Sequence, residues 1–154
     1  MDNSIISKFS LAGKTALVTG GVGLLGSYSA ATFAAAGANV VIVDLPQNID
    51  RARALADELH KKYGVRACAY GADLTNEAEV NAMFEQAAAE MGSIEIVHSN
   101  AGVGGSRTPD YETPLSDWLR VIYGNLVTMF LVDTAACRIM IRQGHGGSII
   151  NTCS

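Results

Sequence analysis

The sequence predicts an α/β fold of the doubly wound kind, in which a parallel sheet carries helices on both faces. Three observations lead to this prediction. Short, nearly continuous apolar runs alternate with longer helical runs, as in parallel sheets that are covered on both sides. A glycine-rich turn joins the first apolar run to the first helical run, and a carboxylate ends the second apolar run. We expect one domain over residues 1–154, with a sheet that looks incomplete at its C-terminal end.

The expected elements follow one another in regular alternation. Strands are predicted where β-branched and apolar residues cluster, at residues 14–19, 39–44, 65–70, 94–99 and 148–152. Helices are predicted at residues 23–36, 49–63, 76–91 and 114–142, with a break near Gly124 in the last one. Gly37 and Gly64 suit the position that ends a helix, while Asn48 and Thr75 are expected N-caps.

The glycine turn indicates a site for a phosphate-bearing ligand. Gly21, Gly23 and Gly26 match the pattern G-x-G-x-x-G between a strand and a helix. Glycine has no Cβ, so the backbone can approach a pyrophosphate closely. The start of the next helix then presents free N–H groups and a partial positive charge to it. The sequence therefore predicts a dinucleotide-binding domain of the Rossmann type.

Asp44 ends the second expected strand and indicates which dinucleotide binds. A carboxylate about 20 residues beyond the glycines accepts hydrogen bonds from the adenosine ribose and repels a 2′-phosphate. No Arg or Lys lies in the glycine turn, and Leu45 and Pro46 follow Asp44. We therefore expect NAD rather than NADP. The simpler alternative is that Asp44 only ends a strand, and the glycines upstream favour the ribose role.

Composition narrows the class of protein. The 154 residues carry a net charge of −4 and 49% hydrophobic residues, which is typical of a soluble domain with its own core. The basic residues are scattered, so nucleic acid and membranes are not expected partners. The cysteines and histidines have no metal-ligand or disulfide spacing, which favours reduced thiols in the cytoplasm and no metal. The start of the chain does not read as a signal peptide, and the apolar run 126–132 is far shorter than the roughly 20 residues that span a bilayer.

Taken in their order, these motifs resemble the short-chain dehydrogenase/reductase family from about Gly13 to Ser154. Residues 99–102, Ser-Asn-Ala-Gly, resemble the Asn-Asn-Ala-Gly signature that follows the fourth strand of that family. Residues 149–154 resemble its fifth strand, which ends in the catalytic Ser. The residues that the resemblance and the glycine pattern assign to the cofactor are Thr19, Gly20, Gly21, Gly23, Leu25, Gly26, Asp44, Asp73, Leu74, Asn100, Ala101 and Gly102.

The resemblance implies an NAD(H)-dependent oxidoreductase that interconverts a secondary alcohol and a ketone by hydride transfer. Ser154 would donate a hydrogen bond to the substrate oxygen, and Asn125 would support the active site from a helix through ordered water. The family's proton-transferring Tyr-x-x-x-Lys pair is expected after Ser154, because no tyrosine of this sequence has a Lys four residues on. The chain thus resembles the N-terminal part of a longer enzyme, and we expect residues 1–154 alone to show no turnover.

Simpler structural roles stand beside these assignments. Ser154 could be an ordinary Ser at a strand end, Asn125 a solvated helix residue, and Asp73 the start of a capping turn. Cys153, next to Ser154, is expected to be a small buried apolar residue rather than a nucleophile, because no His or Lys is placed in the sequence to activate it.

Two alternatives to a dehydrogenase remain open at this point. Leu24 stands where compact family members carry a glycine, and the position of Gly23 is typical of longer members that include epimerases and dehydratases. A non-catalytic NAD-binding module would keep the same glycines.

The apolar residues Leu126, Met129 and Phe130 are expected to lie in the core or at a subunit interface. By analogy with the family, the latter predicts a homodimer or homotetramer.

Overall fold

The computed structural model describes residues 7–105 and 108–153. The predicted catalytic residue Ser154 lies outside these described residues.

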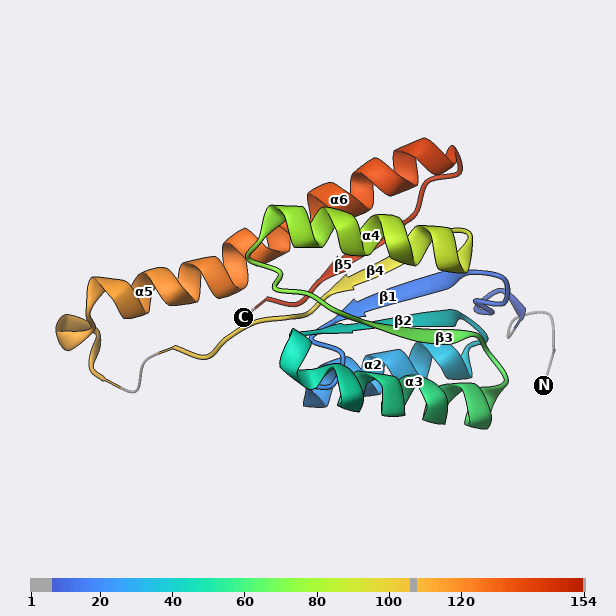
Figure 1. The fold of residues 1–154 in the computed structure, drawn as a ribbon, viewed down its shortest axis with the longest axis horizontal. Coiled ribbons are helices and arrows are strands. Elements are labelled where there is room, and N and C mark those ends of the chain that lie inside the picture. Colours follow the sequence, from blue (N-terminus) through green and yellow to red (C-terminus); the bar gives the residue numbers. More distant parts are fainter. Residues whose placement is uncertain (1–6, 106–107, 154) are drawn as a thin grey trace.

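A single parallel sheet forms the middle of the molecule (Figure 1). Its strands are β1 (Thr15–Thr19), β2 (Asn39–Asp44), β3 (Ala67–Gly71), β4 (Ile96–Ser99) and β5 (Ser148–Asn151). Their order across the sheet is β3-β2-β1-β4-β5, and every neighbouring pair is parallel. After β1 the chain adds β2 and β3 on one side of β1, and it then returns to add β4 and β5 on the other side of β1. The resulting switch point between β1 and β4 is where such sheets bind ligands, beyond the carboxyl ends of the strands.

Helices cover both faces of the sheet, so the predicted fold class is confirmed (Figure 1). Helices α2 (Leu24–Ala35) and α3 (Ile49–Tyr63) lie against one face. Helices α4 (Glu77–Met91) and α6 (Thr128–Gln143) lie against the other. Short 3₁₀ turns lie at Pro46–Asn48 and Asp110–Glu112. Helix α5 (Leu115–Ile122) extends away from the sheet and continues into α6.

The core has one layer on each side of the sheet. Leu17 of β1 packs with Phe84 of α4 and Ile139 of α6 in one apolar cluster. The next residue of β1, Val18, packs with Leu59 of α3 in the other cluster. Neighbouring strand residues point to opposite faces, and all five residues of β1 are buried because the strand is covered on both sides.

The expected break near Gly124 is a π-helical turn at Tyr123–Val127, which keeps the helix continuous. The segment Leu115–Gln143 is consequently 29 residues long and, by length and composition alone, apolar enough to cross a membrane. The helix predicted at residues 114–142 is confirmed almost to its ends, and the apolar run 126–132 is only its middle part. The core helix of a soluble domain passes the same test, and in α6 the residues Val132 and Ile139 are buried against the sheet.

The predicted N-cap was wrong at α4, whereas Asn48 is confirmed as the N-cap position of α3. Asn76, and not Thr75, caps α4, where its side chain accepts hydrogen bonds from the N–H groups of Ala78 and Glu79. The Thr75 hydroxyl instead donates to Asp73 Oδ1 at 2.7 Å. Asn48 does precede α3, but its side chain forms no capping hydrogen bond there.

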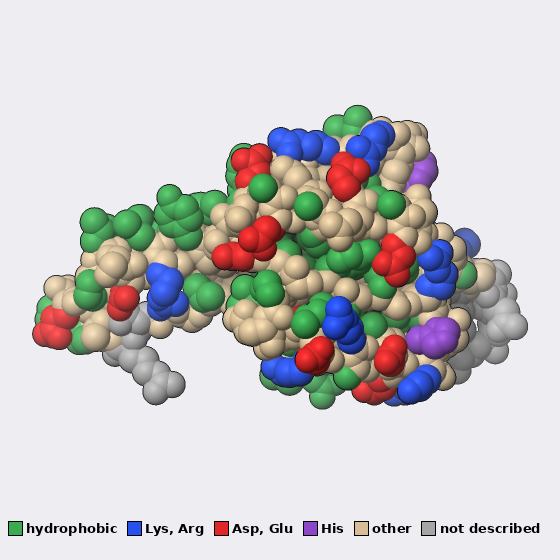
Figure 2. Space-filling view, viewed as in Figure 1, with side chains coloured by type: hydrophobic (Ala, Val, Ile, Leu, Met, Phe, Trp, Pro, Cys, Tyr) green, Lys and Arg blue, Asp and Glu red, His purple; other side chains and the backbone are tan. Residues whose placement is uncertain are grey.

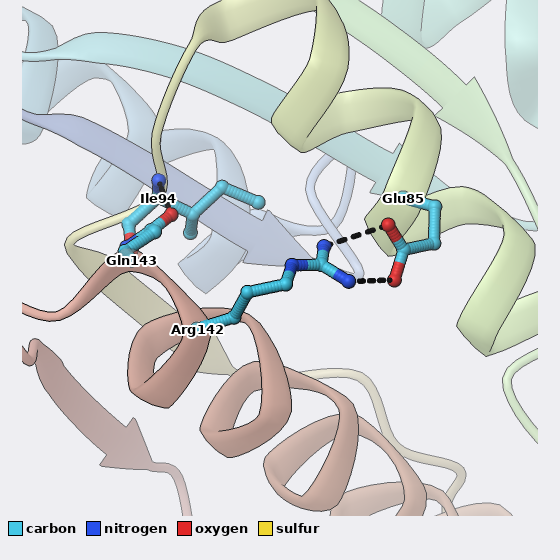
Figure 3. Close-up of polar contacts among 4 residues, drawn as sticks. All are labelled: Glu85, Ile94, Arg142 and Gln143. Carbon is cyan, nitrogen blue, oxygen red and sulfur yellow. Dashed lines mark hydrogen bonds and ion pairs between the residues drawn. The ribbon is translucent and has the colours of Figure 1, made fainter.

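Two polar contacts join the end of α6 to its neighbours (Figure 3). The Arg142 guanidinium donates two hydrogen bonds, of 2.9 and 2.7 Å, to the Glu85 carboxylate on α4, and these lower the pKa of Glu85. The Gln143 amide accepts from the N–H of Ile94 at 2.8 Å and donates to its carbonyl at 3.0 Å. The second contact aligns α6 with the segment that leads into β4.

Candidate cofactor site

The glycine turn after β1 is shaped by two glycines that tolerate no side chain. Gly20 has a φ of +61°, in the left-handed region that favours glycine. A Cβ on Gly26 would collide with the carbonyl oxygen of Gly20. Helix α2 can therefore begin close to the end of β1. Its N-cap, Gly23, supplies no capping side chain, and its first turn holds no acidic residue, so its N–H groups are open to an anion.

Thr19 joins the glycine turn to the segment that follows β4. Its hydroxyl oxygen accepts hydrogen bonds from the N–H groups of Asn100 at 2.9 Å and Ala101 at 3.0 Å, and donates to the carbonyl of His98 at 3.4 Å. The Asn100 side chain donates to the Thr19 carbonyl at 3.1 Å. A hydroxyl has one donor and two acceptor positions, so the buried Thr19 is fully satisfied. These bonds hold the carboxyl ends of β1 and β4 together at the switch point.

Asp44 lies at the end of β2 with its carboxylate largely buried. Asp44 Oδ1 accepts hydrogen bonds from the N–H of Leu45 at 2.9 Å and from the side-chain amide of Asn48 at 2.7 Å. Asp44 Oδ2 accepts one from the N–H of Val22 in the glycine turn at 3.1 Å. A carboxylate offers about four acceptor positions, so these contacts leave one on Oδ2.

Asp73 and Leu74 follow the end of β3. Asp73 Oδ1 accepts hydrogen bonds from the N–H and hydroxyl of Thr75, so the capping-turn alternative describes part of its role. Leu74 is buried and belongs to the core cluster beneath the sheet's C-terminal edge. Both residues also line the cavity described next.

A cavity of about 650 Å³ opens along the carboxyl ends of the strands. Its size is in the usual range for cofactor sites. It brings together most of the predicted cofactor residues, namely Gly20, Gly23, Leu25, Asp44, Asp73, Leu74, Asn100, Ala101 and Gly102. Thr19, Gly21 and Gly26 do not line it. Thr19 and Gly26 hold its floor in shape instead.

Several residues that line the cavity were not predicted from the sequence. Asn48 and Arg51 lie at its Asp44 end, and Val103 and Thr128 also line it. A usable signal existed for the first two, because they follow Asp44 by one and two turns of helical chain. No local signal pointed to Val103 or Thr128, which reach the cavity through the packing of the loop after β4 and of α6.

Asn125 lies in the π-helical turn, outside the cavity lining. Its Oδ1 accepts a hydrogen bond from the N–H of Val103 at 3.1 Å. Its Nδ2 donates to the carbonyls of Val103 at 3.0 Å and Val121 at 2.8 Å. Asn125 therefore fastens the helix directly to the loop after β4. The role through ordered water stays a prediction.

His98 of β4 and Cys153, which follows β5, lie toward the same end of the sheet. His98 Nε2 is 2.8 Å from the Thr152 hydroxyl oxygen, its Nδ1 is buried without a partner, and burial lowers the pKa of His98. Cys153 is exposed, so its expected burial was wrong, because β5 ends at Asn151 on the edge of the described sheet. Within residues 7–105 and 108–153, no cluster of three His, Cys, Asp or Glu side chains could hold a metal ion.

The fold is of the Rossmann type, with a cavity at the carboxyl ends of its parallel strands. A family model described as short chain dehydrogenase matches residues 14–154, and the chain belongs to this short-chain dehydrogenase/reductase family. The resemblance found in the sequence is thereby confirmed. The family uses a nicotinamide cofactor.

Similar proteins carry out redox reactions on small molecules. A cis-4-hydroxycyclohexanecarboxylate dehydrogenase of Sinomonas cyclohexanicum is 36% identical over 94% of this chain and 56% of its own length. The structure of an NAD⁺-bound xylitol dehydrogenase is 31% identical, with a TM-score of 0.87 over 96% of this chain and 54% of its own. The structure of an NADPH-dependent 3-quinuclidinone reductase from Rhodotorula rubra is 33% identical, with a TM-score of 0.83 over 100% of this chain and 57% of its own. The chain thus spans just over half the length of these relatives.

Proposed function

We propose that this chain forms the cofactor-binding part of an NAD(H)-dependent oxidoreductase that interconverts a secondary alcohol and a ketone by hydride transfer. The choice of NAD rests on one observation, the placement of the Asp44 carboxylate at the end of the cavity. Its remaining acceptor position on Oδ2 suits the 2′-hydroxyl of an adenosine ribose, which is a donor. A 2′-phosphate has no proton to donate to it and carries the same sign of charge.

Residues around the cavity would each contact a different part of the dinucleotide. The open N–H groups at the start of α2 would receive the pyrophosphate. Asp73 and Leu74 would flank the adenine, and Asn100, Ala101 and Gly102 would lie beside the nicotinamide half. The nicotinamide supplies the hydride chemistry when it is bound, and the protein supplies orientation. Asn125 would keep the loop after β4 in place through its bonds to Val103.

The proton needed by the reaction would come from the Tyr-x-x-x-Lys pair that the resemblance places after Ser154. Ser154 would donate a hydrogen bond to the substrate oxygen. Residues 1–154 alone are therefore expected to bind the cofactor without turning over substrate.

Replacing Asp44 by Ala tests the cofactor assignment. The affinity for NADH should fall about tenfold to a hundredfold, because a hydrogen bond to a charged group contributes about 1.5–3 kcal/mol, whereas the affinity for NADPH should not fall. Isothermal titration calorimetry with each dinucleotide measures both. Asp57→Ala removes an exposed carboxylate of α3 outside the cavity and serves as the matched control. Unchanged affinities for both dinucleotides in Asp44→Ala would overturn the assignment to NAD.

The glycine spacing favours a second candidate, an epimerase- or dehydratase-type relative that recycles its NAD in place. The observation behind it is Gly23, which takes the position typical of such members. NAD that remains bound through purification would favour this candidate. Cofactor that exchanges freely during titration would favour the dehydrogenase.

An exposed row of apolar side chains suggests how subunits associate (Figure 2). We define the apolar stripe as the exposed residues along α5, the π turn and the start of α6, which are Leu115, Trp118, Leu119, Tyr123, Leu126 and Phe130. Apart from the adjacent pair Trp118 and Leu119, they recur every three or four residues and so share one side of the helix. We propose that this stripe pairs subunits of a homodimer or homotetramer in the cytoplasm, where the free cysteines would stay reduced.

A further inference from the structure

The end of the cavity that holds Asp44 also holds a cation. Arg51 of α3 lines the same cavity, and its Nη2 donates a hydrogen bond to the Val22 carbonyl at 3.3 Å. The N–H of Val22 donates to Asp44 Oδ2 on the other side. The backbone of Val22 therefore lies between an anion and a cation. Among the residues that the structure describes, Arg51 forms no ion pair.

Asn48 controls the orientation of the Asp44 carboxylate. Its amide donates to Asp44 Oδ1 at 2.7 Å, the shortest of the three hydrogen bonds on that carboxylate. With the Leu45 N–H it fills both acceptor positions of Oδ1. The acceptor position that remains for a ligand is then on Oδ2. Without Asn48 the carboxylate would be held by two backbone N–H groups alone.

We propose that Asn48 and Arg51 decide how this cavity responds to the 2′-position of the adenosine ribose. Asn48 is a positioning residue that holds Asp44 ready for a 2′-hydroxyl. Arg51 is a cationic contact for a 2′-phosphate, which partly offsets the repulsion from Asp44. This inference rests on the proposed function, because it requires a nicotinamide dinucleotide in the cavity.

The physical basis is the different chemistry of the two groups. A carboxylate accepts from a hydroxyl, while the planar guanidinium donates two parallel hydrogen bonds to a phosphate. The discrimination between NAD and NADP is then set by the balance of Asp44 and Arg51. Removal of Arg51 should sharpen the preference for NAD, and removal of Asp44 should let Arg51 act unopposed.

The first experiment measures the affinities of NADH and NADPH for Arg51→Gln by calorimetry. We expect the NADPH affinity to fall about tenfold and the NADH affinity to stay within about twofold. In the Asp44→Ala background, Arg51→Gln should cause the same selective loss. Arg53→Gln is the matched control, since Arg53 lies two residues away, pairs with Asp50 at 3.5 Å and does not line the cavity. Equal effects on both dinucleotides, or none, would overturn the role of Arg51.

The second experiment is a double-mutant cycle between Asn48 and Asp44. Asn48→Ala should weaken NADH about threefold to tenfold, with no matching loss for NADPH, and should have no further effect once Asp44 is Ala. Asn81→Ala, on α4 and bonded to Arg138, is the control. A loss that is equal for both dinucleotides, or that persists in Asp44→Ala, would show a merely structural role and overturn this part.

A simpler probe covers the case in which Asp44→Ala does not fold. Binding of adenosine 2′,5′-bisphosphate and of 5′-AMP to Arg51→Gln compares ligands that differ only in the 2′-phosphate. A loss confined to the bisphosphate supports the inference, and its absence overturns it. If NADH and NADPH both fail to bind the unaltered protein, the proposed function itself fails. If NADH binds and Arg51→Gln changes nothing, only this inference fails.

Discussion

At the scale of single residues, His98 shows how burial changes an ordinary side chain. It lies on β4 with its ring edge-to-face against Phe33, and only Nε2 has a hydrogen-bond partner. Burial lowers the pKa of His98 below its ordinary value of 6.5. The folded protein therefore holds the neutral imidazole, while the unfolded chain takes up a proton more readily.

This difference predicts a loss of stability in mild acid. At a pH below about 6.5 the unfolded state binds more protons at His98 than the folded state does, so the free energy of unfolding falls as the pH falls. Above that pH the imidazole is neutral in both states, and this loss is absent. His98→Gln keeps a polar group near Thr152 and cannot titrate. Urea unfolding at about pH 7.5 and about pH 5.5 should show a smaller loss for His98→Gln than for the unaltered protein. Equal losses in His98→Gln and the unaltered protein would contradict the prediction.

At the scale of elements, the side-chain amide of Gln143 holds the end of α6 against the backbone of Ile94. Ile94 lies before β4, where its N–H and carbonyl have no strand partner and both bond the Gln143 amide (Figure 3). Ile94 itself is fully buried. A buried backbone N–H or carbonyl without a hydrogen-bond partner destabilises the folded state, because it has given up its hydrogen bond to water.

Gln143→Ala should therefore lower the free energy of unfolding by about 1–3 kcal/mol. Gln86→Ala removes an exposed glutamine from α4 and should change it by less than about 0.5 kcal/mol. Chemical denaturation followed by circular dichroism measures both. The same small change in the two variants would mean that water replaces the amide at Ile94.

At the scale of the whole molecule, α5 and the apolar stripe stand away from the sheet (Figures 1 and 2). Phe130 is 65% exposed and Leu126 is 62% exposed, which costs free energy unless another surface covers them. Pairing of two copies across the stripe would remove both side chains from water.

Leu126→Glu combined with Phe130→Glu should convert an oligomer into a smaller species, because each subunit would bury carboxylates against its partner. Sedimentation velocity of the purified protein gives the mass. Ile141→Glu places a charge at the exposed far end of the same helix, outside the stripe, and should leave the mass unchanged. An oligomer that survives the double substitution would show that the stripe is not the interface.

Local patterns in the sequence determined the fold class and the centre of the site. The glycine turn, the carboxylate at the end of β2 and the alternation of strands and helices are each visible within a short stretch of chain, because they depend on neighbours in sequence and on periodicity. Where the local signal was ambiguous, prediction failed. Thr75 and Asn76 are both good caps, and only the geometry of the turn at Asp73 decided between them.

The tertiary structure alone decided which side chains hold the site in shape. Thr19 and Asn100 are separated by 81 residues in sequence, and Asn125 reaches Val103 across 22, yet each pair is joined by hydrogen bonds. Arg51 meets the backbone of Val22 only because α3 packs beside the glycine turn. Such contacts depend on how the sheet and helices assemble, which no short window of sequence contains. The sequence therefore determined which groups line the cavity, and the fold determined how those groups are held.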